Sequence, residues 1–256
     1  MQKPFLALAL FWACASYAGE CHFEDLADSF RNWSHAVQEG QARLDTTDLT
    51  SSLSSIHTKG YASLDTASLF PKEELKKIMD AMPSSSSILF SVEEKIESGE
   101  VWADGKKMHQ LSDSELLPFR QYAEWITEQL NESLSRETQV KLVIAEVRTA
   151  HSGSEGTRFG DWHHDGLYVA ITTSLYGDGT QYLVTNPKID TAEFFSQGKE
   201  HTEGKPYLTA PLGHSLIFSA RERWKKRRDV PSTIHRSPPE DSDRMLLILR
   251  FEEESD

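Results

Sequence analysis

The chain has 256 residues, of which 38% are hydrophobic and 10% aromatic, a composition too apolar for an intrinsically disordered protein. This length suits one ordinary domain with a sizeable core. The formal net charge of −13 argues against binding nucleic acid over a broad surface, because such proteins present a basic face to the phosphates.

The first eighteen residues, MQKPFLALALFWACASYA, have the pattern of a secretory signal peptide. Lys3 precedes an apolar run from Phe5 to Cys14, and small residues follow up to Ala18, so we expect cleavage before Gly19. The run is too short to span a bilayer. We therefore expect a secreted or periplasmic protein, or one in the secretory-pathway lumen, and a cytoplasmic protein if the segment is not cleaved. The mature chain would keep one of the two cysteines, which excludes an internal disulfide.

Residues 19–139 are predicted to be mainly helical and to pack on the rest of the chain. Apolar positions at helical spacing predict a helix over 20–45. FPKEELKKIMDAM, at 70–82, and LLPFRQYAEWITEQLNESL, at 116–134, predict two more, each with a proline near its start. The Ser- and Thr-rich stretch between 45 and 60 is expected to be a loop.

From residue 140 onwards the sequence predicts seven short strands with almost no helix between them. The stretches are VKLVIAEVRTA, LYVAITTSLY, TQYLVT, YLTA, HSLIFSA, PSTIHR and RMLLILRFE. Helices followed by strands predict an α+β fold, with helices on one face of a β-sandwich or jelly roll, and residues 140–256 as its core.

The motif DWHHDG, residues 161–166, suggests a metal site. In a strand, residues two apart point to the same face, so His163 and Asp165 would project together while His164 points away. His235, in STIHRSPP, offers a third ligand. Two histidines and one carboxylate form the facial triad of non-haem iron oxygenases. The alternative for such a short pattern is a hydrogen-bonded histidine in a polar turn.

Arg244 strengthens the metal hypothesis. It follows His235 by nine positions and opens the last predicted strand, so both residues would lie at the same rim. A planar guanidinium binds a carboxylate through two hydrogen bonds. Arg250 shares the face of Arg244 but lies six residues on, about 20 Å along the strand. We therefore expect one small ligand to use Arg244 alone.

WHHDG and HRSPPEDSDRMLLILRF together resemble the Fe(II)/2-oxoglutarate-dependent dioxygenase superfamily, whose pattern is H-x-D, a distant His, and an Arg or Lys some nine to eleven residues later. The resemblance covers about residues 140–252. It implies a double-stranded β-helix, iron bound by His163, Asp165 and His235, and 2-oxoglutarate anchored by Arg244. It also implies that Gly213 forms the tight turn before a core strand, with a plain turn glycine as the alternative.

The same resemblance implies an enzyme that hydroxylates an unactivated C–H bond, with ascorbate as an accessory reductant. Nothing in the sequence distinguishes an amino acid, a peptide or another small metabolite as its substrate. A Gly or Ala in place of Asp165 would instead indicate a halogenase.

Other side chains have two interpretations. Tyr168 and Tyr182 could hydrogen-bond the co-substrate carboxylate, or pack in the core. The stretch HSGSEGTRFGD, at 151–161, could be a lid that closes on substrate, or an ordinary flexible loop. Arg158 within it, and Arg148 before it, are candidates to contact the substrate.

The stretch ARERWKKRRD, residues 220–229, is a basic cluster in an acidic protein. It precedes His235, so it should flank the mouth of the site and could recruit an anionic ligand. The simpler interpretation is a solvated loop.

Two other functions compete with the oxygenase hypothesis. One is a cupin-like metal- or ligand-binding barrel without catalytic activity, and the other is a silent barrel that binds a partner through its helical half. A cupin-like binding protein has no need for Arg244, so this residue favours the oxygenase. We expect a small-molecule or peptide partner, no nucleic acid and no membrane span.

Overall fold

The computed structural model describes residues 28–29, 31–32, 52–70, 72–82, 86–92, 96–103, 105–134, 138–150, 160–184, 187–198, 202–238 and 243–254. The predicted signal peptide, almost all of the expected helix over 20–45, and Arg158 with most of the expected lid lie outside these ranges. Within the described residues, no helix combines the length and the apolar character needed to cross a membrane.

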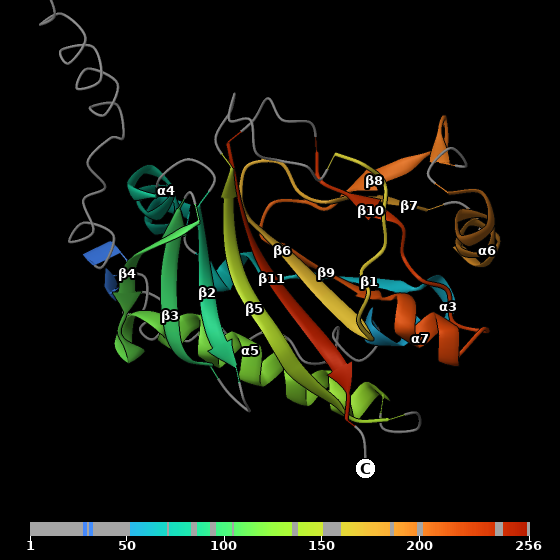
Figure 1. Cartoon of the computed structure of the whole chain (residues 1–256), viewed down its shortest axis with the longest axis horizontal. Helices are drawn as coiled ribbons and strands as arrows, with labels where there is room; N and C mark the ends of the chain where they lie inside the picture. Colours follow the sequence, from blue (N-terminus) through green and yellow to red (C-terminus); the bar gives the residue numbers. More distant parts are fainter. Residues whose placement is uncertain are drawn as a thin grey trace, which may run out of the picture.

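The strands form an eight-stranded sheet, in the order β1-β9-β6-β11-β5-β2-β3-β4, and a three-stranded sheet, in the order β10-β7-β8 (Figure 1). All their pairings are antiparallel. The strands are β1 (Tyr61–Asp65), β2 (Ser86–Val92), β3 (Ile96–Ala103), β4 (Lys106–Leu111), β5 (Val140–Ala150), β6 (Val169–Tyr176), β7 (Gln181–Leu183), β8 (Tyr207–Thr209), β9 (His214–Ser219), β10 (His235–Arg236) and β11 (Arg244–Glu253). The helices are α3 (Ile56–Lys59), η1 (Ala67–Leu69), α4 (Lys72–Ala81), α5 (Asp113–Leu134), α6 (Pro187–Gln197) and α7 (Arg221–Lys226).

From β5 onwards the chain winds between the two sheets. β5 and β6 lie in the large sheet, β7 and β8 in the small one, β9 in the large one, β10 in the small one and β11 in the large one. The segment between β5 and β6 joins the small sheet through a bridge between His163 and His235. This alternation makes a double-stranded β-helix, or jelly roll, so the predicted α+β fold class is confirmed.

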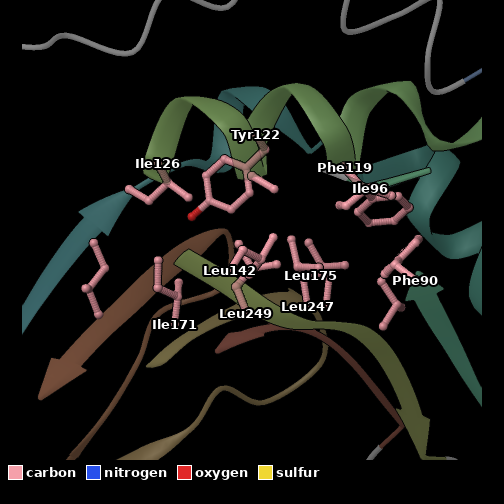
Figure 2. Close-up of a cluster of buried hydrophobic side chains, with 14 of the residues drawn as sticks. Phe90, Ile96, Phe119, Tyr122, Ile126, Leu142, Ile171, Leu175, Leu247 and Leu249 are labelled. Carbon is pink, nitrogen blue, oxygen red and sulfur yellow. The ribbon is translucent and has the colours of Figure 1, made fainter. Parts of the chain in front are cut away.

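The main core lies between the large sheet and the helices α4 and α5, as Figure 2 shows for α5. Phe119, Tyr122 and Ile126 of α5 face Leu247 and Leu249 of β11. β11 is buried on both faces, with residues of the second face lining the inside of the barrel. A strand buried on both sides needs a continuous apolar run, which explains MLLIL.

All seven strands predicted after residue 140 are present, and Gly213 forms the expected turn, with φ of 77°. The prediction of almost no helix between them was wrong, because α6 and α7 lie between strands. The short helix α7 has a highly charged sequence, which predicted a solvated loop. Its helical form depends on contacts with the rest of the fold.

The first half of the chain departs further from expectation. It contributes four strands as well as helices, and part of the expected loop at 45–60 forms α3. β2, β3 and β4 extend the barrel sheet beyond β5, and β1 extends it beyond β9. These strands are rich in Ser, Glu and Lys, which have low strand propensity, so their pairing depends on the neighbouring sheet.

The helix expected at 116–134 begins earlier, at Asp113. Glu115 accepts hydrogen bonds from the backbone N–H of Ser112 at 2.7 Å and from its hydroxyl at 2.6 Å. The N–H of Glu115 in turn donates to the carbonyl of Ser112 at 3.1 Å. This arrangement satisfies donors at the helix start, so the cap, and not Pro118, fixes where α5 begins.

Candidate metal centre

His163 and His235 lie opposite each other although they are far apart in the sequence. The N–H of each donates to the carbonyl of the other, both at 2.8 Å. The expected strand around His163 is reduced to this single bridge. The two rings lie on the same face, with centroids 4.4 Å apart.

Asp165 completes a cluster with the two histidines. One ligand atom from each residue lies within 4.8 Å of the other two, and Nε2 of His235 is 3.9 Å from Oδ2 of Asp165. This separation is too long for a hydrogen bond and leaves room for an ion between the atoms. The structure therefore brings together the three residues that the sequence predicted as ligands.

The backbone fixes which ring nitrogen of each histidine faces the cluster. Nδ1 of His163 lies 2.9 Å from the carbonyl oxygen of Asp161, and Nδ1 of His235 lies 3.3 Å from that of Thr233. A carbonyl only accepts, so both Nδ1 atoms carry the proton and both Nε2 atoms keep a lone pair. Metal-binding histidines are oriented in this way, so the donor set fits a divalent ion such as Fe(II).

Burial keeps His235 neutral. Its side chain is in the barrel interior, and desolvation lowers its pKa to about 4, although the carboxylate of Asp165 acts in the opposite direction. A neutral imidazole is the form that binds metal. The ring is therefore ready to act as a ligand at neutral pH.

A cavity extends from the three ligands along the inner face of β11. Its lining includes Arg244, Leu246, Ile248 and Arg250, which are alternate residues of that strand. Arg250 Nη2 lies 3.5 Å from Oδ1 of Asp165. Arg244 and Arg250 therefore line the same cavity, and the expectation that one small ligand uses Arg244 alone stays a prediction.

Arg148 also lines the cavity and pairs with Glu146 at 2.7 Å, and its contact with substrate stays a prediction. Sequence patterns did not indicate Thr172 and Thr180, which line the same cavity. Threonine at an inward position of a strand is common in a core, so only the register of the barrel could have identified these two.

The two predicted co-substrate tyrosines are not in the cavity lining. Tyr168 is 3% exposed and belongs to the main core, with its ring 5.9 Å from the guanidinium of Arg223. Tyr182 is 5% exposed and packs edge-on against Tyr61, with centroids 4.9 Å apart. Burial raises its pKa. Both residues follow the packing interpretation.

His164 points away from the cluster, as the alternation of a strand predicts. Its ring packs against Phe194 and Phe195 of α6, and Phe195 stacks on Trp224 of α7 at 4.2 Å. Burial lowers the pKa of His164 to about 4. The residue therefore anchors α6 and α7 to the ligand segment.

The basic cluster at 220–229 is helical around α7 and its charges are largely engaged. Lys225 pairs with Glu222 at 2.6 Å, and Lys226 with Glu253. Arg223 is fully buried and donates to Nδ1 of His57 at 3.1 Å. None of these residues lines the described cavity, and the helix α7 with its buried Arg223 is not a solvated loop, so recruitment of an anion stays a prediction.

No protein-family model matches the chain, and no curated protein matches its sequence. Many of the solved structures that it is similar to are 2OG-Fe(II) oxygenases. An oxidoreductase of that family from Burkholderia pseudomallei has 10% identity and a TM-score of 0.47, with 82% of this chain and 92% of that chain covered. A prolyl-4-hydroxylase from Pseudomonas putida has 11% identity and a TM-score of 0.44, with 81% and 100% covered.

The epimerase SnoN of nogalamycin biosynthesis, described as non-heme and alpha ketoglutarate dependent, has 12% identity and a TM-score of 0.47, with 82% of this chain and 84% of that chain covered. These similarities are of overall fold.

Proposed function

We propose that the chain is an Fe(II)- and 2-oxoglutarate-dependent oxygenase that hydroxylates an unactivated C–H bond of an amino acid, a peptide or a small metabolite. The observation that carries this proposal is the convergence of His163, Asp165 and His235 within 4.8 Å, with Arg244 in the same cavity. Three ligands on one side of an ion leave other positions open for a co-substrate and oxygen.

Arg244 would bind the distal carboxylate of 2-oxoglutarate. It is 4% exposed, and the inner face of β11 runs from it towards the ligands. Arg250 would act at the metal end, where its positive charge can hold the carboxylate of Asp165 and attract the carboxylate of the co-substrate. Thr172 and Thr180 offer hydroxyl groups along the same path.

The bound groups would supply the oxidising chemistry: one oxygen atom of O2 enters the substrate as a hydroxyl, the other enters succinate, and CO2 leaves. The chain's own residues position these groups and exclude water. Leu246 and Ile248 provide an apolar floor between the two arginines. Charge interactions are stronger on such a floor than in bulk water.

The test is anaerobic loading of the protein with Fe(II) and 2-oxoglutarate, followed by optical spectroscopy. We expect a weak charge-transfer band in the green that is lost in His235→Ala and Arg244→Ala. His214→Ala and Arg228→Ala are matched controls, because neither residue lines the described cavity, and both should keep the band. If the band stayed intact in His235→Ala and Arg244→Ala, the assignment of these two residues to the metal and the co-substrate would be wrong.

Since Arg244 is buried, its loss could also unfold the chain, so Arg244→Lys is the second variant. It keeps the charge but not the planar fork, and we expect about tenfold weaker 2-oxoglutarate binding from a folded protein. Iron- and oxygen-dependent release of succinate then separates an oxygenase from a cupin-like binding barrel, which would bind metal and release none.

A further inference from the structure

The segment that carries two of the three ligands is weakly attached to the small sheet. In the described part of it, residues 160–168, two backbone hydrogen bonds join it to β10, and both involve His163. On the Asp165 side the segment is held to α7, because the N–H groups of Arg221 and Glu222 donate to the carbonyls of Asp165 and Leu167 at 2.9 and 3.1 Å. On the Trp162 side its ladder to β10 is one residue pair long, which by itself gives little resistance to fraying. A slip by one residue would turn the ligands to the other face.

The register of the bridge places a second pair beside the histidines. Since His163 lies opposite His235 in an antiparallel pairing, Trp162 lies opposite Arg236. Neighbouring residues of an extended strand alternate between faces, so the two side chains lie on the opposite face from the ligands, and Arg236 also contributes to the lining of the cavity. Directly opposed side chains are the units that stabilise paired strands.

The contacts of Arg236 extend across the whole small sheet. Its guanidinium carbon lies 4.4 Å from the ring centroid of Trp162 and 5.2 Å from that of Tyr207 on β8. Its Nε donates to Oε1 of Gln181 on β7 at 2.7 Å. The rings of Trp162 and Tyr207 meet edge-on at 5.7 Å. These four side chains, which we call the clamp, connect the ligand segment to all three strands of the sheet.

Arg236 has no carboxylate partner among the residues that the structure describes, unlike Arg148 and Arg250. Its contacts are with two aromatic faces and one amide. A guanidinium beside aromatic faces is held in place by cation–π attraction and by its own planarity. The side chain therefore joins neighbouring segments through these ring and amide contacts.

We infer that Arg236 is a positioning residue for the metal centre, which acts by clamping Trp162 so that His163 and Asp165 stay in register with His235. The inference rests on the proposed function only in requiring that the cluster binds a divalent metal. Residues that orient metal ligands from behind typically change affinity by about 10- to 100-fold when they are replaced.

The experiment titrates the full chain with Co(II) and follows its visible absorption bands, which report ligand number and geometry. We expect Arg236→Gln and Trp162→Leu each to weaken Co(II) binding about tenfold or more and to alter the band shape. The double variant should be little worse than either single one, because both remove the same clamp. Arg236→Lys and Trp162→Phe, which keep a cation over a ring, should recover part of the affinity.

Arg228→Gln is the matched control. Arg228 also lies over a tryptophan, with its guanidinium carbon 3.8 Å from the ring centroid of Trp224, but outside the bridge. It should bind Co(II) as the wild-type chain does. Unchanged affinity and spectrum in Arg236→Gln, or an equal loss in Arg228→Gln, would overturn the inference.

Hydrogen exchange in the metal-free chain separates this inference from the proposed function. The bridging amides of His163 and His235 should exchange about tenfold faster in Arg236→Gln, while amides in the centre of β11 keep their protection. Faster exchange with no iron and 2-oxoglutarate band would support the clamp and reject the oxygenase. Unchanged exchange at both histidines would reject the clamp, whether or not that band forms.

Discussion

The guanidinium of Arg250 lies 3.5 Å from the carboxylate of Asp165, so the one acidic residue of the metal cluster faces a cation as well as two imidazoles. Nε of Arg250 is buried and has no hydrogen-bond partner in the described part of the chain. The side chain is therefore only partly satisfied by the protein. It has hydrogen-bonding capacity left for an anion at the metal end of the cavity.

We predict that Arg250→Met lowers succinate formation by about 10- to 100-fold, because Asp165 loses the group that orients its second oxygen. Arg250→Lys keeps the charge and should lose less. Succinate release at saturating Fe(II) and 2-oxoglutarate provides the measurement. Turnover in Arg250→Met equal to that of the wild-type chain would show that the contact with Asp165 is incidental.

The buried histidines predict a pH dependence of stability in the metal-free chain. Burial lowers the pKa of both His164 and His235 to about 4 from the usual 6.5. Between these values the unfolded chain binds protons that the folded chain does not. Stability is therefore complete above about pH 6.5 and is lost as pH falls towards 4, by up to about 1.4 kcal/mol per pH unit for each group.

Carboxylates also titrate in acid, so the measurement compares two chains. His164→Phe keeps the aromatic packing against Phe194 and Phe195 and removes the ionisable group. Urea midpoints from pH 7 to pH 4.5 should fall less steeply for this variant than for the wild-type chain. Parallel curves would mean that His164 titrates in the folded protein as it does in the unfolded one.

Sequence patterns predicted the parts of the fold in which local and tertiary preferences agree. β5 has the bounds that its β-branched run indicates, and the H-x-D spacing with His235 identified the three clustered residues. Spacing reports which side chains share a face, and this information was sufficient for the ligands. It was also sufficient to direct His164 away from them.

The rest depends on distances that a sequence does not contain. The rise of β11 gives the spacing of Arg244 and Arg250 along the strand, but not how far each side chain reaches into the cavity that both line. Tyr168 and Tyr182 are chemically able to bind a carboxylate, but packing placed them elsewhere. The strands β2 to β4 have weak intrinsic signals and form because β5 offers them an edge.

Two buried serines on β9 differ in their hydrogen bonds, so we expect replacement by alanine to have opposite effects on stability at the two positions. Ser215 Oγ lies within hydrogen-bond distance of three hydroxyl groups, those of Tyr122 at 2.6 Å, Thr173 at 2.7 Å and Thr66 at 3.1 Å. Ser219 Oγ is equally buried and has no hydrogen-bond partner among the described residues. Ser215→Ala should cost about 1–3 kcal/mol of unfolding free energy, because it leaves buried hydroxyls unsatisfied.

Ser219→Ala removes an unsatisfied oxygen and should be neutral or slightly stabilising. Chemical denaturation of both variants gives the comparison. The network around Ser215 faces α5, on the opposite side of the sheet from the cavity, so Ser215→Ala should keep its affinity for 2-oxoglutarate. Equal stability of the two variants would contradict the assignment of these hydrogen bonds.

Gly177 couples the turn after β6 to the position of Arg244. It has φ of 72°, and a Cβ there would lie 1.9 Å from the carbonyl oxygen of Asp243 and 3.0 Å from Cα of Arg244. Gly105, with φ of 71°, has no atom within 4 Å of an added Cβ. Gly105→Ala should therefore cost only the left-handed backbone penalty, about 1–2 kcal/mol of unfolding free energy.

Gly177→Ala should cost more unfolding free energy and also weaken 2-oxoglutarate binding, because the strand that carries Arg244 must shift. Denaturation midpoints and the 2-oxoglutarate titration test this pair, and equal behaviour of the two variants would show that the close approach does not set the arginine's position.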